Sequence, residues 1–296
     1  GSTDKTRAII ESYSDPRIKA FHLSTNQGVG SALDFGLSQT TGKYIAKADA
    51  DDIHHPNRLY KQKIFLDTHS DISLVKTLIN YFPHDERTKE SNRYKHCKSF
   101  REQFKNCVTS SEDLKEKIYW TNCIPHTTIM VRSEVMKEVG YDKNLQIGED
   151  YKLCYNLNKK GYAMGTVEEV LVDIRISEYS TTVRYDSELW KVVFQIKENE
   201  ILRLFDEGKR VFLWGAGGKG VGFLNLLLPL KHNVFGFIDT DKEKQKQTVA
   251  NLRVFPPDIL ERGDKVIITS QPGLYSIGEE LKKRGFLPLE DFIGFF

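Results

Sequence analysis

The sequence has little cysteine, and its cysteines are not spaced as metal ligands. Only four occur among 296 residues, and no two form a Cys-x-x-Cys pair: Cys97, Cys107, Cys123 and Cys154. Structural zinc sites and disulfide-stabilised secreted domains both depend on closely spaced cysteines. The pattern therefore argues against both classes and favours a reducing compartment, which predicts a cytoplasmic protein.

Long hydrophobic runs are missing as well. No stretch approaches the roughly 18 apolar residues that a membrane-spanning helix needs. The first residues contain no apolar segment of the kind found in secretory signals. We therefore expect neither a membrane span nor a secretory signal in this sequence.

The chain also lacks an excess of charge of either sign. It has 43 basic and 41 acidic residues, for a net charge of +2. This balance is not typical of a general nucleic-acid binder, so no nucleic-acid partner is expected. Hydrophobic residues make up 39% of the chain, which is enough for a sizeable core and argues against disorder.

Helical patterns and short apolar runs alternate over residues 1 to about 180. Buried strands are expected over 43–48 and 72–81, with helices before and between them. Such alternation is typical of an α/β fold with a mixed, mainly parallel sheet. The segment 83–117 interrupts it with many charges of both signs. This segment is either a solvated helical insertion or a face that contacts a membrane surface or an acceptor.

A second module follows a long expected helix. From Lys209 the sequence shows a strand, a glycine-rich loop, a helix and a further strand. We therefore expect three parts: an amino-terminal α/β domain over 1–185, a linking helix over 186–207, and a small Rossmann-like α/β domain over 208–296.

An acidic cluster follows the expected strand at 43–48. It consists of Asp49, Asp51 and Asp52. In extended backbone, residues two apart face the same way, so Asp49 and Asp51 would point together. Mg²⁺ commonly joins one or two carboxylates to the phosphates of a substrate. The alternative is an acidic turn in which Asp52 caps the next helix.

Several motifs around this cluster occur in a characteristic order. They are NQGVGSA at 26–32, GKYIA at 42–46, DADD at 49–52, PNRL at 56–59, PHTTIMVR at 125–132 and GEDYKL at 148–153. Together they resemble the family 2 glycosyltransferases of the GT-A fold, over residues 1 to about 180. The opening GSTDKT is similar to the end of that family's first nucleotide-binding motif.

The resemblance implies an inverting, metal-dependent hexosyltransferase that acts in surface glycan or polysaccharide synthesis. It would move a sugar from a nucleotide-diphosphate sugar to a hydroxyl of a glycan, lipid-linked or protein acceptor. Asp150 would be the general base, assisted by Glu149. Mg²⁺ or Mn²⁺ would bind Asp51, with Asp49 or Asp52 assisting. The implied donor site comprises Asn26, Gly28, Asp49, Arg58, His126 and Arg132.

The sequence departs from the family pattern in three ways. It begins after the family's first strand, so we expect an N-terminally truncated chain. Ser177 stands where many relatives have a histidine near the diphosphate. The Q-x-x-R-W signature of processive synthases is absent, which favours transfer of a single sugar. Peripheral membrane contact and homo-oligomerisation stay open.

The glycine loop of the second module matches G-x-G-x-x-G through Gly215, Gly217 and Gly220. Asp239 follows a second expected strand, as does the ribose-binding carboxylate of dinucleotide sites. The loop would hold NAD or another nucleotide, or its glycines would serve packing or assembly alone. The alternative functions for the chain are a nicotinamide-dependent oxidoreductase and a non-catalytic nucleotide-binding module, both centred on this loop.

Overall fold

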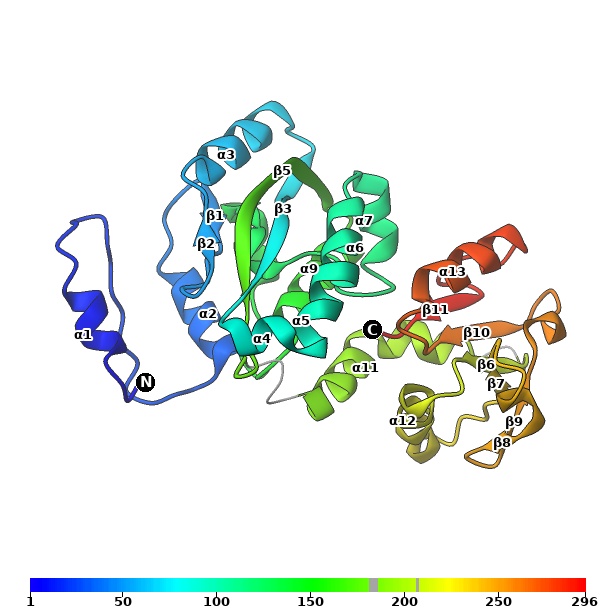
Figure 1. The fold of residues 1–296 in the computed structure, drawn as a ribbon. Helices are drawn as coiled ribbons and strands as arrows, with labels where there is room; N and C mark the ends of the chain where they lie inside the picture. Colours follow the sequence, from blue (N-terminus) through cyan, green and yellow to red (C-terminus); the bar gives the residue numbers. More distant parts are fainter. Residues whose placement is uncertain (181–185, 206–207) are drawn as a thin grey trace.

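Two β-sheets and the helices around them make up the chain. The computed structural model describes residues 1–180, 186–205 and 208–296. In Figure 1 the long helix α11 (Asp186–Arg203) lies between the larger α/β body and the smaller one that follows it. No helix among the described residues combines the length and hydropathy that crossing a bilayer requires. The four cysteines are free.

The first sheet is mixed and has the strand order β1-β4-β3-β5-β2 among the described residues. Most of its paired residues belong to the parallel ladder of β3 and β5, whereas its other three pairings are antiparallel. Residues 72–79 of β3 are almost entirely buried because its apolar side chains face helices on both sides. The strands are β1 (Tyr44–Ala46), β2 (Ile53–His54), β3 (Ile72–Pro83), β4 (Met130–Arg132) and β5 (Ala163–Ile176).

Helices surround this sheet close to the positions that the sequence predicts. The α1 helix lies to one side of the body in Figure 1, and none of its residues is buried. The charged segment forms a chain of short helices that includes one π-helical turn at Cys97–Arg101. The helices are α1 (Thr6–Glu11), α2 (Val29–Ser38), α3 (Arg58–Thr68), α4 (Glu86–Glu90), α5 (Asn92–His96), α6 (Glu102–Cys107), α7 (Ser111–Lys117), α8 (Ser133–Val139) and α9 (Glu149–Lys159).

The second sheet has the order β11-β10-β6-β7-β9-β8, and only the β8–β9 pairing is antiparallel. The chain runs outward from β6 in one direction and returns to β10 on its other side. Such a change of direction creates a crevice at the carboxyl ends of the two strands. The elements are β6 (Val211–Trp214), α12 (Gly218–Leu227), β7 (Gly236–Ile238), β8 (Thr248–Val249), β9 (Leu252–Phe255), β10 (Lys265–Ile268), α13 (Leu274–Lys283) and β11 (Phe292–Gly294).

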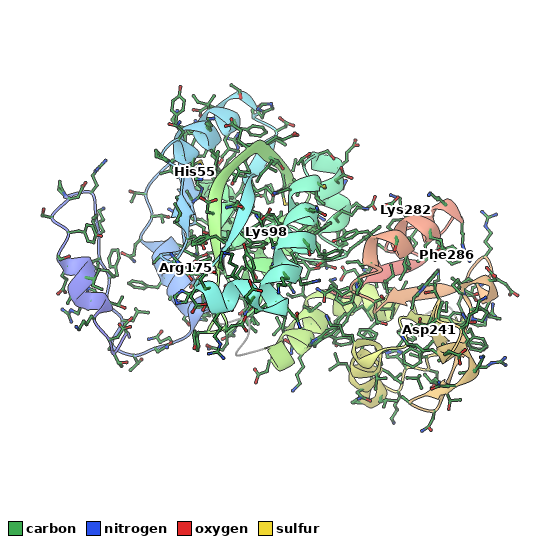
Figure 2. The ribbon with its side chains drawn as sticks, viewed as in Figure 1. His55, Lys98, Arg175, Asp241, Lys282 and Phe286 are labelled. Carbon is green, nitrogen blue, oxygen red and sulfur yellow. The ribbon has the colours of Figure 1, made fainter. Side chains whose placement is uncertain are left out.

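The two bodies share one hydrophobic core. A single cluster of buried side chains continues from β3 and β4 through α11 into β6, β7 and β10. Lys197 of α11 is fully buried, and its ammonium group donates to the carbonyl oxygens of Trp120 (2.9 Å) and Gly294 (2.7 Å). On the surface, Lys282 of α13 pairs with Glu116 of α7 at 3.1 Å (Figure 2).

Trp120 fills this junction, and its removal should destabilise the whole chain. Its side chain is fully buried and packs against Phe292 and Tyr275. Trp120→Ala leaves a large cavity, so we expect the free energy of unfolding to fall by about 3–5 kcal/mol in urea titrations. Tyr60→Ala, at a side chain that is 66% exposed, should stay within about 0.5 kcal/mol of the parent. Equal stability of the two variants would contradict this assignment.

Candidate functional site

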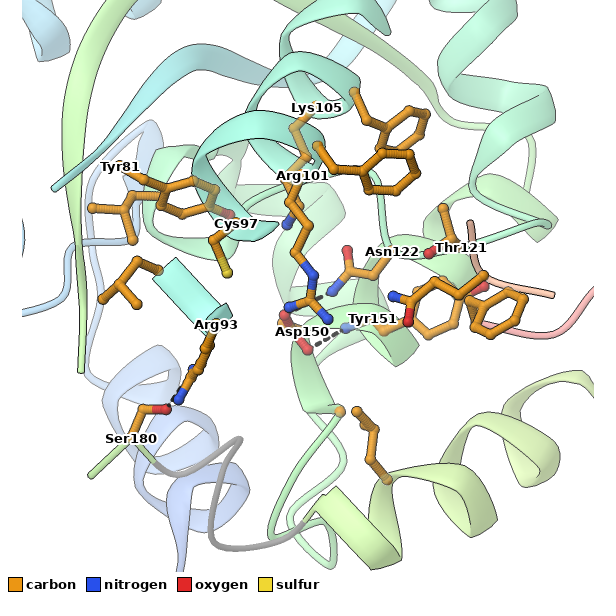
Figure 3. Close-up of a pocket in the computed structure, with 18 of the residues that line it drawn as sticks. Tyr81, Arg93, Cys97, Arg101, Lys105, Thr121, Asn122, Asp150, Tyr151 and Ser180 are labelled. Atoms are coloured by element: carbon orange, nitrogen blue, oxygen red, sulfur yellow. Dashed lines mark hydrogen bonds between the residues drawn. The ribbon is translucent and has the colours of Figure 1, made fainter. Parts of the chain in front are cut away.

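A pocket of about 700 Å³ lies where the carboxyl-terminal ends of strands in the first sheet meet the second body. Its lining runs from the acidic loop through the start of α9 to aromatic residues of α11, α13 and the end of the chain. Figure 3 shows its central part, with Asp150 and Asn122 facing the charged insertion. Its charged and amide lining residues include Asp49, Asp51, Asp52, Arg93, Arg101, Lys105, Asn122, Asp150, Arg175 and Lys219.

The acidic loop is held at the pocket by the neighbouring strand β5. Asp52 accepts a hydrogen bond from the backbone N–H of Arg175 at 2.9 Å, and the Arg175 side chain donates to the carbonyl of Asp51 at 2.9 Å. Arg175 lies near the end of β5 (Figure 2). Burial raises the pKa of Asp52, and repulsion from Asp51 and Asp49 adds to the shift. Asp52 therefore anchors the loop.

The other two carboxylates of the loop are more accessible. Asp49 forms an ion pair with Lys47. The Asp51 side chain is exposed and has no hydrogen bond or ion pair within the described part of the chain. Among the residues that the structure describes, no three His, Cys, Asp or Glu side chains are grouped closely enough to hold a metal ion. Asp49 and Asp51 nevertheless fit Mg²⁺ chemistry, because this ion is commonly held by one or two carboxylates together with substrate phosphates.

Asp150 is presented by the start of α9. The helix begins after Gly148, whose φ of 76° is a left-handed conformation that favours glycine. One carboxylate oxygen of Asp150 accepts from the Asn122 amide at 2.8 Å and the other from the Tyr151 N–H at 2.7 Å (Figure 3). Each oxygen keeps a free lone pair, so the carboxylate can still accept a proton from a bound hydroxyl.

Glu149 and His126 lie in a buried, electrostatically crowded region beside Asp150. Burial raises the pKa of Glu149 to about 7, and the charges of Asp150 and Asp49 act in the same direction. Burial lowers the pKa of His126 to about 4, so the ring is neutral near pH 7. A ring nitrogen of His126 lies 2.7 Å from the Tyr141 hydroxyl. Neither Glu149 nor His126 lines the pocket itself.

The raised pKa of Glu149 predicts a pH-dependent stability. A carboxyl group whose folded pKa exceeds its unfolded value of about 4.3 stabilises the folded state at low pH. This contribution is lost as pH rises toward 7. In metal-free buffer, we expect the parent to lose up to about 3 kcal/mol between pH 4.5 and pH 7.5 relative to Glu149→Gln. Parallel pH profiles of unfolding for the two proteins would contradict this expectation.

Two arginines of the expected donor site hold the backbone together. Arg58 is buried and donates to the carbonyls of Lys47 (2.7 Å) and Ile129 (3.1 Å) behind the acidic loop. Burial lowers its pKa to about 10. Arg132 lies beside the start of β1, at the end away from Asp49, and donates to the carbonyl of Leu66 at 2.7 Å. Neither side chain lines the pocket.

Asn26 and Gly28 form the turn before α2 and also lie outside the pocket lining. The Asn26 side chain accepts from the Gly28 N–H at 2.9 Å, which is an Asx turn. Gly28 has a φ of 88°, and a Cβ there would collide with the Gln146 side chain. The pocket lining therefore includes Asp49, Asp51, Asp52 and Asp150 but not the other five expected donor residues.

The glycine loop of the second sheet is hydrogen-bonded to Asp239, the carboxylate that follows β7. Asp239 accepts from the Ala216 N–H at 3.0 Å and pairs with Lys244 at 2.9 Å. Burial alone would raise the pKa of Asp239, but these donors lower it. A Cβ on Gly220 would lie 2.1 Å from the Gly215 carbonyl, whereas Gly217 has open space around it. The first turn of α12 reaches the pocket through Lys219, which donates to Gln271.

Several pocket residues were not expected from the sequence. Asn122 lies outside the recognisable motifs, so no local signal indicated its bond to Asp150. Arg101 and Lys105 belong to the charged insertion, where only the acceptor-docking alternative pointed to a function. Trp190, Tyr275 and Phe296 reach the pocket through the packing of the second body, which local patterns do not reveal.

Comparison with known proteins gives a family match that includes the acidic loop and ends before α9. Residues 1–140 match the model described as glycosyl transferase family 2. The match covers the amino-terminal part of the chain, from α1 through α8. This chain thus carries a family 2 glycosyltransferase domain, of mixed α/β architecture as the sequence predicts.

Three curated relatives illustrate the range of similarity. An uncharacterized glycosyltransferase of Methanocaldococcus jannaschii is 30% identical over 58% of this chain and 56% of its own. The amylovoran biosynthesis glycosyltransferase AmsE of Erwinia amylovora is 23% identical over 61% and 65%. An Escherichia coli UDP-Gal:α-D-GlcNAc-diphosphoundecaprenol β-1,3-galactosyltransferase is 28% identical over 60% and 60%. The chain thus spans less than two thirds of the length of these relatives.

Proposed function

We propose that this chain is an inverting, metal-dependent glycosyltransferase. It moves one sugar from a nucleotide-diphosphate sugar to a hydroxyl group of an acceptor. The observation that carries the proposal is that Asp49, Asp51 and Asp150 line one and the same pocket. A transferase needs both a site for an anionic leaving group and a base for the attacking hydroxyl.

Asp150 supplies the base in this proposal. Its carboxylate takes the proton of the acceptor hydroxyl while the hydroxyl oxygen attacks the anomeric carbon. The bond from that carbon to the diphosphate breaks, and its electron pair leaves with the nucleoside diphosphate. Attack opposite the leaving group inverts the anomeric centre. Asn122 is a positioning residue, because its 2.8 Å hydrogen bond fixes one oxygen of Asp150.

Asp51 and Asp49 would hold a divalent cation, Mg²⁺ or Mn²⁺. When bound, such an ion neutralises charge on the departing diphosphate. Asp52 is already bonded to the backbone of Arg175 and so contributes by fixing the loop. Lys47 pairs with Asp49 and would have to release it when the ion binds.

The acceptor belongs to surface glycan or polysaccharide synthesis in this proposal. The names of two relatives support it, since one refers to amylovoran biosynthesis and the other to a diphosphoundecaprenol-linked sugar. We place the enzyme in the cytoplasm, with peripheral contact to the membrane where its acceptor is lipid-linked. The charge and apolar composition of the chain are compatible with this placement.

Hydrolysis of a panel of sugar nucleotides tests the activity most directly. We expect the protein to release the nucleoside diphosphate slowly from one member of the panel when Mn²⁺ is present, and to stop when EDTA is added. Asp71→Asn, at an exposed site outside the pocket, serves as a matched control and should hydrolyse at the parental rate. Absence of metal-dependent turnover across UDP-, GDP- and dTDP-sugars would reject the proposal.

For the second body we propose a packing role, with its glycine loop as a structural turn and not a site for NAD. The Asp239 carboxylate already accepts from the Ala216 N–H and pairs with Lys244. These contacts engage the carboxylate that would otherwise accept from the ribose hydroxyls. We expect no NAD binding at millimolar concentration by calorimetry, and the same melting temperature for Gly217→Val as for the parent. Millimolar or tighter NAD binding that Gly217→Val abolishes would instead support a nucleotide site.

A further inference from the structure

We propose that Arg101 and Lys105 form an anion subsite that binds a phosphate or diphosphate group of the acceptor. This inference rests on the proposed transferase function and extends it to the class of acceptor. Both residues come from the charged insertion, Arg101 from the π-helical turn and Lys105 from α6. Both line the pocket that contains Asp150.

The other cations of this pocket already have partners. Arg93 donates to the Ser177 carbonyl (2.8 Å) and the Ser180 hydroxyl (2.9 Å, Figure 3), and Arg175 donates to the Asp51 carbonyl. Lys219 donates to Gln271. Within the described part of the chain, the side chains of Arg101 and Lys105 have no hydrogen-bond or ion-pair partner.

The two cations are held close together despite their repulsion. They are four residues apart, and both side chains are partly buried. Burial lowers the pKa of Lys105, and the charge of Arg101 lowers it further. The Asp150 charge opposes this shift from beyond ion-pair distance. Partly buried cations without a counter-ion are costly, so an anion bound between them would be stabilised.

The insertion that carries these cations is fixed to the sheet. The Asn106 side chain accepts from the Ile79 N–H and donates to the Ile79 carbonyl, each at 2.9 Å. The fully buried Lys76 donates to the Lys105 carbonyl at 2.7 Å. These bonds hold the backbone under the two cations in place, so the subsite is formed before a ligand arrives.

The position of the subsite favours the acceptor over the donor. In Figure 3 Arg101 points toward Asp150 and Asn122, the residues that we assign to the attacking hydroxyl. The donor diphosphate is already assigned to Asp49 and Asp51, which line the same pocket from the acidic loop. An anion beside Asp150 therefore belongs to the molecule whose hydroxyl Asp150 deprotonates.

Binding of inorganic pyrophosphate in EDTA tests the subsite without donor, metal or turnover. Calorimetry should show binding by the parent that weakens about 10-fold in Arg101→Gln and in Lys105→Gln, since each substitution removes a charge-assisted hydrogen bond to the anion. Lys105→Arg keeps the charge and should bind like the parent. Lys95→Gln is the matched control, because Lys95 lies on the same insertion, is exposed and pairs with Glu90.

A second measurement separates the two anion sites. Nucleoside diphosphate binding in Mn²⁺ should be lost in Asp51→Asn and kept in Arg101→Gln. Pyrophosphate binding in EDTA should instead be kept in Asp51→Asn and weaken about 10-fold in Arg101→Gln. Loss of both in Arg101→Gln would assign the cations to the donor and overturn the proposal. So would a parent that binds no pyrophosphate at millimolar concentration. Failure of sugar-nucleotide turnover alone would reject the transferase function and leave the anion subsite standing.

Discussion

Asp150→Asn should lower the rate of sugar transfer by about 10²–10⁴-fold, the usual contribution of a general base. The substitution keeps the size of the side chain and its contact with Tyr151, but an amide cannot take the proton of the acceptor hydroxyl. Donor binding should hardly change, because Asp150 is assigned to the acceptor. The measurement is single-turnover transfer from the donor identified by the hydrolysis panel, with nucleoside diphosphate affinity measured in parallel.

Asp142→Asn gives a matched control for this result. Asp142 lies before α9 and pairs with Lys152 of that helix at 2.6 Å, but it does not line the pocket. It should transfer at close to the parental rate. If Asp150→Asn also retained near-parental transfer, Asp150 would not be the base.

Asp51→Ala should abolish the binding of nucleoside diphosphate that depends on Mn²⁺. The side chain is exposed and makes no bond within the described part of the chain, so its removal should leave the melting temperature unchanged. A lost carboxylate ligand removes most of the attraction for the cation that joins protein and diphosphate. Calorimetry with Mn²⁺ and the nucleoside diphosphate, together and separately, measures the loss.

Asp71→Ala serves as the control for Asp51→Ala, since it removes an exposed carboxylate outside the pocket. It should bind Mn²⁺ and the nucleoside diphosphate like the parent. Parental affinity in Asp51→Ala would place the metal elsewhere. A fall in melting temperature with parental affinity would show that Asp51 stabilises the acidic loop, as Asp52 does.

Local patterns were sufficient to predict most of the secondary structure. The buried apolar run at 72–81 became β3, and the glycine after residue 139 ends α8 with a φ of 66°. These features are local, because hydrophobic periodicity and a left-handed glycine act over a few residues. The carboxylates of the pocket were also predictable, since Asp49 and Asp51 directly follow a strand and Asp150 lies at a helix start.

The roles of the basic residues were not predictable from local sequence. Arg58 and Arg132 occur in motifs that suggest phosphate contact, yet both donate to carbonyls between strands and helices. Arg101 and Lys105 occur in a segment whose composition suggests solvent exposure, yet both line the pocket. A guanidinium can donate to a backbone carbonyl as well as to a phosphate, so only the tertiary position distinguishes the two roles.

The bonds of Lys197 affect how this chain could be recombined with its relatives. One ammonium group on α11 joins the backbone at Trp120, before β4, to the backbone at Gly294, at the end of β11. These contacts join three separate segments: the loop at Trp120, α11 and β11. A chimaera that exchanges only residues 208–296 would replace β11 but keep the other two segments. We therefore expect a chimaera that also exchanges α11 and the loop at Trp120 to be more stable than one that exchanges residues 208–296 alone.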